Sequence, residues 1–352
     1  MYRGRAARPC GALAQPQPPT ALAPRHDQQN GFESRGAIDG RTLKLVDPLA
    51  AQQPDVDLGH AMNRRLQQAL PCAKPALALV LGSGGVKSIA GLGVAEVLHE
   101  QGLWPDLIVG CSAGAIFGAL LALEMKTQEA MQLATQMWSR EVTSKKRWRA
   151  PLELLLPRLM GFNSQRFAMR QDDLICDRLD QVFGGLRIEE LPLRLRINAT
   201  DAHTGERVVL ERGPLAQALR ASIALPFLFS PKRIAEQWLI DGSISDPLPV
   251  ALAQEAKQVV AMGFQVPAPR IVDRASRLAT RTTAALSNNL MQARLDAFGP
   301  GEMLALFPQL PRRIGLFETS AMPELIALGR QAAEAALPGF LQQQAPAIYS
   351  VG

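Results

Sequence analysis

The sequence predicts an α/β fold built around a mostly parallel central sheet. A short apolar run at residues 76–81 ends in a glycine-rich loop, and residues 89–101 after it have helical periodicity. A second apolar run at residues 103–109 ends in a tight Gly-x-Ser-x-Gly turn, after which an alanine-rich run has helical composition. Two consecutive strand–loop–helix units are typical of a parallel sheet whose loops lie at the same strand ends.

The glycine-rich loop occupies residues 82–88 and reads Gly-Ser-Gly-Gly-Val-Lys-Ser. Such a loop at the start of a helix directs several backbone N–H groups into one concavity, which can hold a phosphate or an oxyanion. The spacing from Gly82 to Lys87 and Ser88 is too short for a nucleotide-binding P-loop. A dinucleotide-binding turn would need a third glycine where Lys87 stands.

The second turn, residues 110–114, has the sequence form of a nucleophile elbow with Ser112 at its centre. A sharp strand-to-helix turn brings backbone against backbone, so a Cβ at Gly110 or Gly114 would collide with the neighbouring strand or helix. Ser112 would stand near the positive end of the following helix. The pattern also arises by chance in glycine-rich chains, so the assignment depends on partners elsewhere in the sequence.

A histidine partner for Ser112 is not evident. Two further predicted strands, residues 195–201 and 206–210, are joined by a turn that carries His203. We expect His203 to cap that turn or face solvent, and His99 to lie on the surface of the first helix.

Asp241 offers an alternative partner for Ser112. It ends an apolar run at residues 238–240 and precedes a glycine, and strand ends of an α/β sheet are where functional residues gather. An Asp carboxylate in an apolar pocket keeps enough basicity to accept a serine proton directly. The other interpretation is an Asx-turn, in which Asp241 only accepts backbone N–H bonds.

Composition excludes several classes of protein. The chain has 352 residues, 47% of them hydrophobic, which suffices for one large domain or two small ones. Its four cysteines lack Cys-x-x-Cys spacing and its four histidines are scattered, so we expect neither a disulfide framework nor a metal site. No apolar run has the length of a transmembrane helix. Free thiols and the lack of a clear export signal favour the cytoplasm or the inner face of the membrane.

The basic charge of the chain is local. Residues 140–170 contain eight Lys and Arg against two Glu, an excess that equals the net charge of +6. Large apolar side chains lie among them, which suits peripheral contact with an anionic membrane surface, centred on Lys145, Lys146, Arg147, Trp148 and Arg149. The alternative is a solvated helix with a buried leucine face. The chain carries no nucleic-acid-binding motif, so nucleic acid is not expected as a partner.

Five stretches together resemble the patatin-like phospholipase family, whose members use a Ser-Asp dyad in place of a triad. They occur in the same order as the motifs of the family, and it is the five together that make the resemblance specific. They are the loop 82–87, the elbow 110–114, residues 199–201 with 204–206, residues 220–226 with 229–231, and residues 241–243 with 246–250.

The resemblance implies a three-layer α/β/α fold with C-terminal helices and a serine acyl hydrolase without metal or organic cofactor. It makes Ser112 the nucleophile and Asp241 the general base. The oxyanion hole would be formed by backbone N–H groups of Gly82, Ser83, Gly84 and Gly85. The substrates would be phospholipids or other fatty acyl esters, cleaved through an acyl-enzyme. The alternatives are a lipid-binding protein without hydrolytic activity and an acyltransferase.

The sequence departs from the family pattern at Ser83 and Ser88, where glycine is usual, and at Ser243, where glycine or alanine is usual. A Cβ at Ser88 is expected to alter the φ of the loop and tilt one N–H away from the oxyanion. Losing one donor costs about 3 kcal/mol of transition-state stabilisation. Ser112 and Asp241 are both present, so we still expect an active enzyme.

We divide the chain into three parts on this basis. Residues 1–74, rich in Ala, Pro, Gln, Arg and Gly, are expected to form a disordered or loosely packed leader. We expect residues 75–265 to form the patatin-like catalytic domain. We expect residues 266–352 to form a helical extension packed on it, with helical patterns at 276–298 and 323–337 whose apolar stripes are packing faces.

Overall fold

The computed structural model describes residues 74–143, 145–299 and 301–344. The leader predicted for residues 1–74 therefore lies outside the described residues, apart from Lys74. The strands of the described part are β1 Leu77–Leu81, β2 Leu107–Cys111, β3 Arg194–Asp201, β4 Arg207–Leu210, β5 Lys232–Ile234, β6 Gln237–Asp241, β7 Gln258–Met262 and β8 Met303–Leu306. They form one sheet in the order β5-β6-β3-β2-β1-β7-β8, and β4 also pairs with β3.

The pairing of the strands confirms the predicted mostly parallel sheet. β3, β2, β1, β7 and β8 are parallel neighbours, whereas β4 and β6 are antiparallel to β3 and β5 is antiparallel to β6. The register of β1 and β2 pairs Leu81 with Gly110. The two loops that follow these strands therefore lie side by side at one edge of the sheet, as the sequence predicted.

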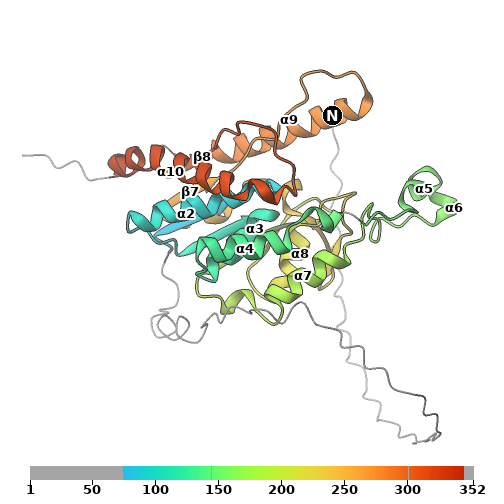
Figure 1. Cartoon of the computed structure of the whole chain (residues 1–352), viewed down its shortest axis with the longest axis horizontal. Helices are drawn as coiled ribbons and strands as arrows, with labels where there is room; N and C mark the ends of the chain where they lie inside the picture. The colour runs from blue at the N-terminus through green and yellow to red at the C-terminus, as the bar shows by residue number, and fades with distance from the viewer. Residues whose placement is uncertain (1–73, 144, 300, 345–352) are drawn as a thin grey trace, which may run out of the picture. The chain divides into compact units, whose positions relative to one another are not determined.

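Helices cover both faces of the sheet and give three layers (Figure 1). The α-helices are α2 Ala90–Glu100, α3 Ala113–Ala122, α4 Thr127–Met137, α5 Ala150–Leu155, α6 Pro157–Met160, α7 Asp173–Phe183, α8 Leu215–Ser222, α9 Ala275–Leu295 and α10 Met322–Gln344. The 3-10 helices are η1 Gly85–Ile89, η2 Arg140–Thr143, η3 Ile188–Glu190, η4 Gly242–Ile244, η5 Val250–Ala253 and η6 Thr319–Ala321. Alternate residues of β1 point to the two faces: Leu79 packs with α2 and α3, and Val80 packs with η5.

The second strand begins later than predicted. The apolar run from Leu103 was expected to be extended, but β2 starts at Leu107. Pro105 has no backbone N–H to donate to a neighbouring strand, so the hydrogen-bond ladder of β2 begins only after it. The Asp106 side chain instead accepts the N–H of Ala76, which fixes the start of β1 beside the start of β2.

The helix α10 packs closely on α2 through two glycines. A Cβ on Gly93 of α2 would stand 2.1 Å from the carbonyl oxygen of Ile326, and one on Gly329 of α10 would stand 1.9 Å from that of Ala90. Buried side chains of α10, among them Leu325, complete this contact. The prediction that the apolar stripe of this helix is a packing face is confirmed.

The prediction that the apolar stripe is a packing face is wrong for much of α9. Its buried residues are Ala284 and Met291, whereas Leu278 and Leu286 are exposed. The sequence also gave no indication of β8, which pairs with β7 and extends the sheet beyond the predicted catalytic domain. Within the described ranges, every helix is too short or too polar to cross a bilayer.

Candidate active site

Ser112 stands at the turn between β2 and α3, directly before the first residue of that helix. Its φ of 55° and ψ of −129° are strained for a residue with a side chain, and such strain persists only where the surroundings impose it. A Cβ on Gly110 would lie 2.4 Å from the Cα of Ala115, and one on Gly114 would lie 2.4 Å from the carbonyl oxygen of Leu81. The predicted steric need for both glycines is confirmed.

Asp241 comes to Ser112 through the sheet. β2 pairs with β3 and β3 pairs with β6, so that Cys111 lies opposite Asn198 and Asp241 opposite Ala199. The Ser112 Oγ donates a hydrogen bond of 2.7 Å to Oδ2 of Asp241. Two residues 129 positions apart in the chain thus meet in the geometry that direct proton transfer requires.

Burial of Asp241 makes its carboxyl harder to ionise than an exposed aspartate. Its side chain is 2% exposed, and burial raises the pKa of the carboxyl above its ordinary range. Hydrogen bonds from Ser112 and Ser243 oppose this shift. Oδ1 accepts the N–H of Ser243 at 2.8 Å, so the Asx-turn that the sequence left as an alternative is present together with the contact to Ser112. One oxygen holds the turn and the other faces the serine.

Two residues that sequence reasoning did not single out hold this pair in place. The Oγ of Ser222 accepts the backbone N–H of Ser112 at 2.9 Å and donates to the carbonyl oxygen of Asn198 at 2.7 Å. The side-chain amide of Asn198 donates to the carbonyl oxygens of Gly242 and Asp246, each at 2.9 Å. Ser222 lies in the 220–226 motif, which was the available signal, but its partners are remote in sequence.

The glycine-rich loop has fewer available donors than expected. The N–H of Gly82 donates to the carbonyl oxygen of Met262 at 2.9 Å, and that of Ser83 donates to Pro247 at 2.8 Å. Because these two groups already hold the loop against β7 and its preceding segment, they are not free to bind an oxyanion in this structure. This corrects the expectation for Gly82 and Ser83.

Gly84 and Gly85 remain as candidates. Among the described residues, no group accepts a hydrogen bond from either N–H. Gly85 has a φ of 63°, a left-handed conformation that favours glycine, and a Cβ there would lie 2.7 Å from the carbonyl oxygen of Leu316. The expected oxyanion donors are thereby narrowed to two adjacent glycines.

Ser88 does not disturb the loop in the way we expected. It lies in η1, its φ is not in the left-handed region, and its side chain is fully buried. Its Oγ donates a 2.8 Å hydrogen bond to the carbonyl oxygen of Gly82. The hydroxyl therefore bridges the two ends of the loop, and its Cβ imposes no unusual backbone conformation.

The two described histidines of interest lie apart from Ser112. His203 is exposed in the turn after β3, where its N–H donates to Asp201. His99 is half-buried and stacks on Trp104, with the ring centroids 4.1 Å apart. Among residues 74–344, as far as the structure describes them, no group of three His, Cys, Asp or Glu side chains has an arrangement that suits a metal ion.

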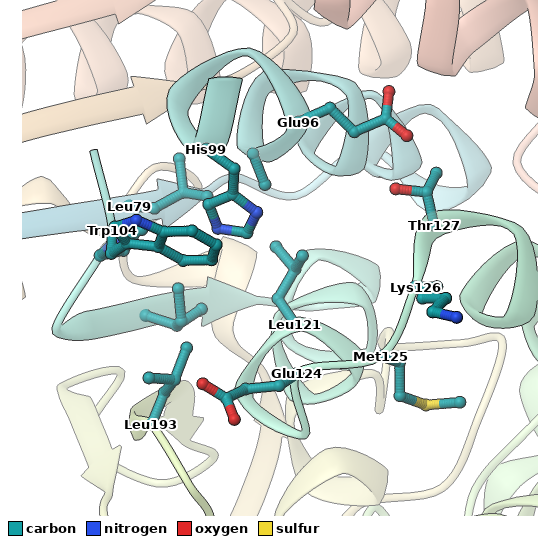
Figure 2. A pocket seen from close by; sticks show the side chains of 13 residues that line it. Leu79, Glu96, His99, Trp104, Leu121, Glu124, Met125, Lys126, Thr127 and Leu193 are labelled. Carbon is teal, nitrogen blue, oxygen red and sulfur yellow. The ribbon is translucent and has the colours of Figure 1, made fainter. Parts of the chain in front are cut away.

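His99 and Trp104 form one side of an apolar pocket of about 550 Å³ (Figure 2). Leu79 and Ile108 of the sheet line it, and Glu96 stands at its edge. None of its lining residues belongs to the loop 82–88 or to the Ser112–Asp241 pair. Its lining includes residues of α2 and α3 and the segment 104–105 before β2, whereas Ser112 follows the end of β2.

The basic segment forms an arm that carries α5 and α6 (Figure 1). Its leucines are not buried: Leu155 is 76% exposed and Leu159 is 79% exposed, and Trp148 is 73% exposed. The alternative of a buried leucine face is therefore wrong for this segment. Lys145, Lys146 and Arg149 are exposed as well, and Arg147 is half-buried.

The base of the arm is joined to the segment that holds Asp241. The N–H of Met169 donates to the carbonyl oxygen of Phe227 at 2.7 Å, and the N–H of Asp241 donates to that of Ala224 at 3.0 Å. Phe227 itself is exposed and has a positive φ of 68°. The segment 224–227 is thus hydrogen-bonded both to the base of the arm and to Asp241.

Comparison with known proteins places this site in a family. Residues 79–253 match a family model described as patatin-like phospholipase. Through this match, the chain belongs to the patatin-like phospholipase family. Its mostly parallel sheet with flanking helices is the patatin fold. The matched residues include both members of the Ser112–Asp241 pair and end at the last residue of η5, so β7, β8, α9 and α10 lie beyond them.

The patatin-like chain has relatives in bacteria and yeasts. An uncharacterized NTE family protein of Mycobacterium tuberculosis is 35% identical over 179 residues, which cover 51% of this chain and 46% of the relative. A second such protein of that species is 30% identical over 315 residues, covering 82% of this chain and 50% of the relative. Lysophospholipase NTE1 of Meyerozyma guilliermondii is 29% identical over 205 residues, covering 57% of this chain and 13% of the relative. The chain spans about half the length of the two mycobacterial relatives, or less for the yeast protein.

Proposed function

We propose that the protein is a serine hydrolase that cleaves fatty acyl esters of membrane-derived lipids, with Ser112 as nucleophile and Asp241 as general base. The observation that carries the proposal is the 2.7 Å hydrogen bond from the Ser112 Oγ to the buried Asp241 carboxylate. Membership of the patatin-like phospholipase family supports lipid acyl hydrolysis in general. A relative named as a lysophospholipase supports single-chain phospholipids as the substrate class.

The geometry supports a two-step reaction. The Ser112 Oγ attacks the ester carbonyl carbon while its proton passes to Oδ2 of Asp241. The N–H groups of Gly84 and Gly85 and the N-terminus of α3 stabilise the negative oxygen that forms. The intermediate collapses, the lipid alcohol leaves with the proton from Asp241, and an acyl-enzyme remains. Water then attacks the acyl carbon while Asp241 accepts its proton. The bond from that carbon to the Ser112 Oγ breaks, Asp241 returns the proton to the Oγ, and the fatty acid is released.

The raised pKa of Asp241 fits this role. A carboxyl group that holds its proton more tightly than usual is a stronger base once ionised, which brings it closer to the basicity needed to accept a serine proton. In the sheet, apolar side chains such as Leu239 and Ala199 pack around its strand. The burial that raises the pKa therefore follows from the position of β6 in the core.

The test is fatty acid release from a lysophospholipid by the wild type and by Ser112→Ala. Hydrolysis by the wild type that falls to background in Ser112→Ala, with an unchanged circular dichroism spectrum, would support the proposal. Release that is equal in the two proteins would refute it. A wild type that passes the acyl group to a lipid acceptor, with no free fatty acid, would indicate an acyltransferase instead.

We further propose that the arm attaches the protein to an anionic membrane surface. Exposed leucines at its tip can enter the acyl region while neighbouring Lys and Arg contact phosphate groups. Arg149 also lies 5.2 Å from the Trp148 ring, which keeps a cation beside an aromatic side chain suited to the interface.

Vesicle sedimentation tests the arm. The double variant Leu155→Ser/Leu159→Ser should lose binding to vesicles that contain phosphatidylglycerol, and binding by the wild type should weaken as salt is added. The matched control is Leu278→Ser/Leu286→Ser, which removes two similarly exposed leucines from α9. Equal loss in the two double variants would contradict a specific role for the arm.

A further inference from the structure

Lys87 is a buried cation without a counter-ion among the described residues. Its side chain is 8% exposed, and its ammonium group lies 5.7 Å from the centre of the Phe264 ring. No described carboxylate or carbonyl forms an ion pair or hydrogen bond with it. Burial lowers its pKa, which reflects the cost of keeping an ammonium group away from water and partners. A bound anion would offset the cost of this unpaired, buried ammonium group.

The ammonium group lines a hollow of about 810 Å³. The hollow lies at the ends of β1, β7 and β8, where the segments after these strands come together. Its apolar walls include Phe264, Val266, Phe307, Leu310 and Ile314. Every charged side chain among its described lining residues is cationic: Lys87, Arg312 and Arg313.

The three cations differ in their availability. Arg312 is held by Glu318 at 2.6 Å and by Glu324 at 3.0 Å. Arg313 is exposed and forms no ion pair with any residue in the described ranges. Lys87 and Arg313 are therefore the two groups that can receive an anion.

The hollow adjoins the loop of the proposed active site. Lys87 follows Gly85 by two residues in η1. The Phe264 ring lies 3.6 Å from the place that a Cβ on Gly84 would occupy. One short loop thus carries both the proposed oxyanion donors, Gly84 and Gly85, and the unpaired ammonium group of Lys87.

We propose that this hollow is an anion subsite that binds a phosphate group, with Lys87 and Arg313 as its cations. A phosphate has several oxygens in different directions, so an ammonium and a forked guanidinium can bind it together. The apolar walls would contact the carbon atoms next to it. The inference rests on the proposed hydrolase activity for the source of that phosphate, a lysophospholipid headgroup. Free inorganic phosphate has the same chemistry and is the second source to be tested.

The experiment is calorimetric titration of the Ser112→Ala protein, which binds lipid without consuming it. The ligands are inorganic phosphate, lysophosphatidic acid below its micellar concentration, and a monoacylglycerol with the same chain. Each is titrated into Ser112→Ala alone and with Lys87→Met, Arg313→Gln or the control Arg281→Gln added. Arg281 is exposed on α9 and outside the hollow.

We expect Lys87→Met and Arg313→Gln each to weaken lysophosphatidic acid binding about tenfold or more, with monoacylglycerol binding and the Arg281→Gln control unchanged. If inorganic phosphate also binds, and its binding also depends on Lys87, the phosphate group alone is sufficient. If lysophosphatidic acid binds and inorganic phosphate does not, the phosphate must be carried by a lipid. Affinity for lysophosphatidic acid that is unchanged in both variants would overturn the inference.

The outcome is separable from that of the hydrolase proposal. Binding that depends on Lys87 in a protein that hydrolyses no ester would leave the subsite standing and remove the hydrolase. If the wild type is active, the Arg313→Gln variant should have a higher KM for lysophosphatidic acid, with its kcat and its turnover of monoacylglycerol unchanged. Hydrolysis of both lipids with an unchanged KM would remove the subsite and leave the hydrolase.

Discussion

The backbone N–H of Ser112 donates a 2.9 Å hydrogen bond to the Oγ of Ser222, which lies 110 residues further along the chain. Ser222 ends α8, and its hydroxyl donates a hydrogen bond to the carbonyl oxygen of Asn198 on β3. A strained residue at a turn is thereby fixed to a helix and to the sheet. This contact orients the serine that faces Asp241 without touching its Oγ.

Ser222→Ala should lower kcat about tenfold or more and change KM little, because it leaves the buried N–H of Ser112 without a partner and loosens the turn. Steady-state kinetics with a p-nitrophenyl ester measures this. Ser222→Thr retains a hydroxyl and should recover most of the lost rate. A rate unaffected by Ser222→Ala would show that the turn holds its shape without this hydrogen bond.

Ser88→Gly should lower the free energy of unfolding by about 1–2 kcal/mol, because it removes a buried hydroxyl that bridges the loop to Gly82 and adds backbone freedom. It should not raise the rate of ester hydrolysis, since Ser88 does not distort the loop. Urea unfolding and initial rates provide the two measurements. A large gain in rate would restore the earlier expectation that this serine impairs the oxyanion donors.

The rate constant kcat/KM should rise with pH as Asp241 ionises, with a midpoint above the ordinary range of an aspartate. The reason is that burial raises the pKa of this carboxyl. A pH–rate profile on a neutral ester measures the midpoint. An ascending limb centred at or below about 3.9, the usual aspartate pKa, would contradict a buried base.

The raised pKa of Asp241 also predicts how the stability of the fold depends on pH. The folded state holds the Asp241 proton more tightly than the unfolded state, so stability falls as pH rises from the unfolded pKa to the folded pKa. Asp241→Asn should therefore be more stable than the wild type at neutral pH, and the difference should shrink as the solution is acidified toward the unfolded pKa. Thermal unfolding of both proteins at several pH values measures the trend, and a difference that does not change with pH would contradict it.

Gly329→Ala should destabilise the fold by about 1–3 kcal/mol, because its Cβ would enter the contact between α10 and α2. The matched control on the same helix is Gly339→Ala, where a Cβ meets no atom within 4 Å and the higher helix propensity of Ala should leave stability equal or slightly raised. Thermal unfolding compares the two. Equal melting temperatures would show that α10 does not pack on α2 as described.

The sequence predicted local features well because their physical causes are local. The need for glycine at 110 and 114 follows from the turn itself, and both strands that lead into the two loops are short apolar runs. By contrast, the N–H groups of Gly82 and Ser83 are occupied by carbonyl oxygens of Met262 and Pro247. No feature of the loop reveals those acceptors, because they come from segments that join it only in the folded sheet.

The same limit explains what was missed elsewhere. Ser222 has an ordinary appearance in a helical pattern, and its role arises from two partners on other elements. The strand β8 is short and only partly buried, and its sequence has no alternation that marks an exposed edge. The proximity of Asp241 to Ser112 was anticipated from family resemblance and from its strand end; the antiparallel pairing of β6 that produces it was not.

The most direct test of the Ser112–Asp241 proposal is covalent labelling with a fluorophosphonate ester, read by intact-protein mass spectrometry together with turnover of a p-nitrophenyl ester. We predict a single added label and turnover in the wild type and in the control Ser276→Ala, neither in Ser112→Ala, and strongly reduced labelling and turnover in Asp241→Asn. A folded wild type that takes no label and releases no product, or a label that persists in Ser112→Ala, would contradict the proposed catalytic pair.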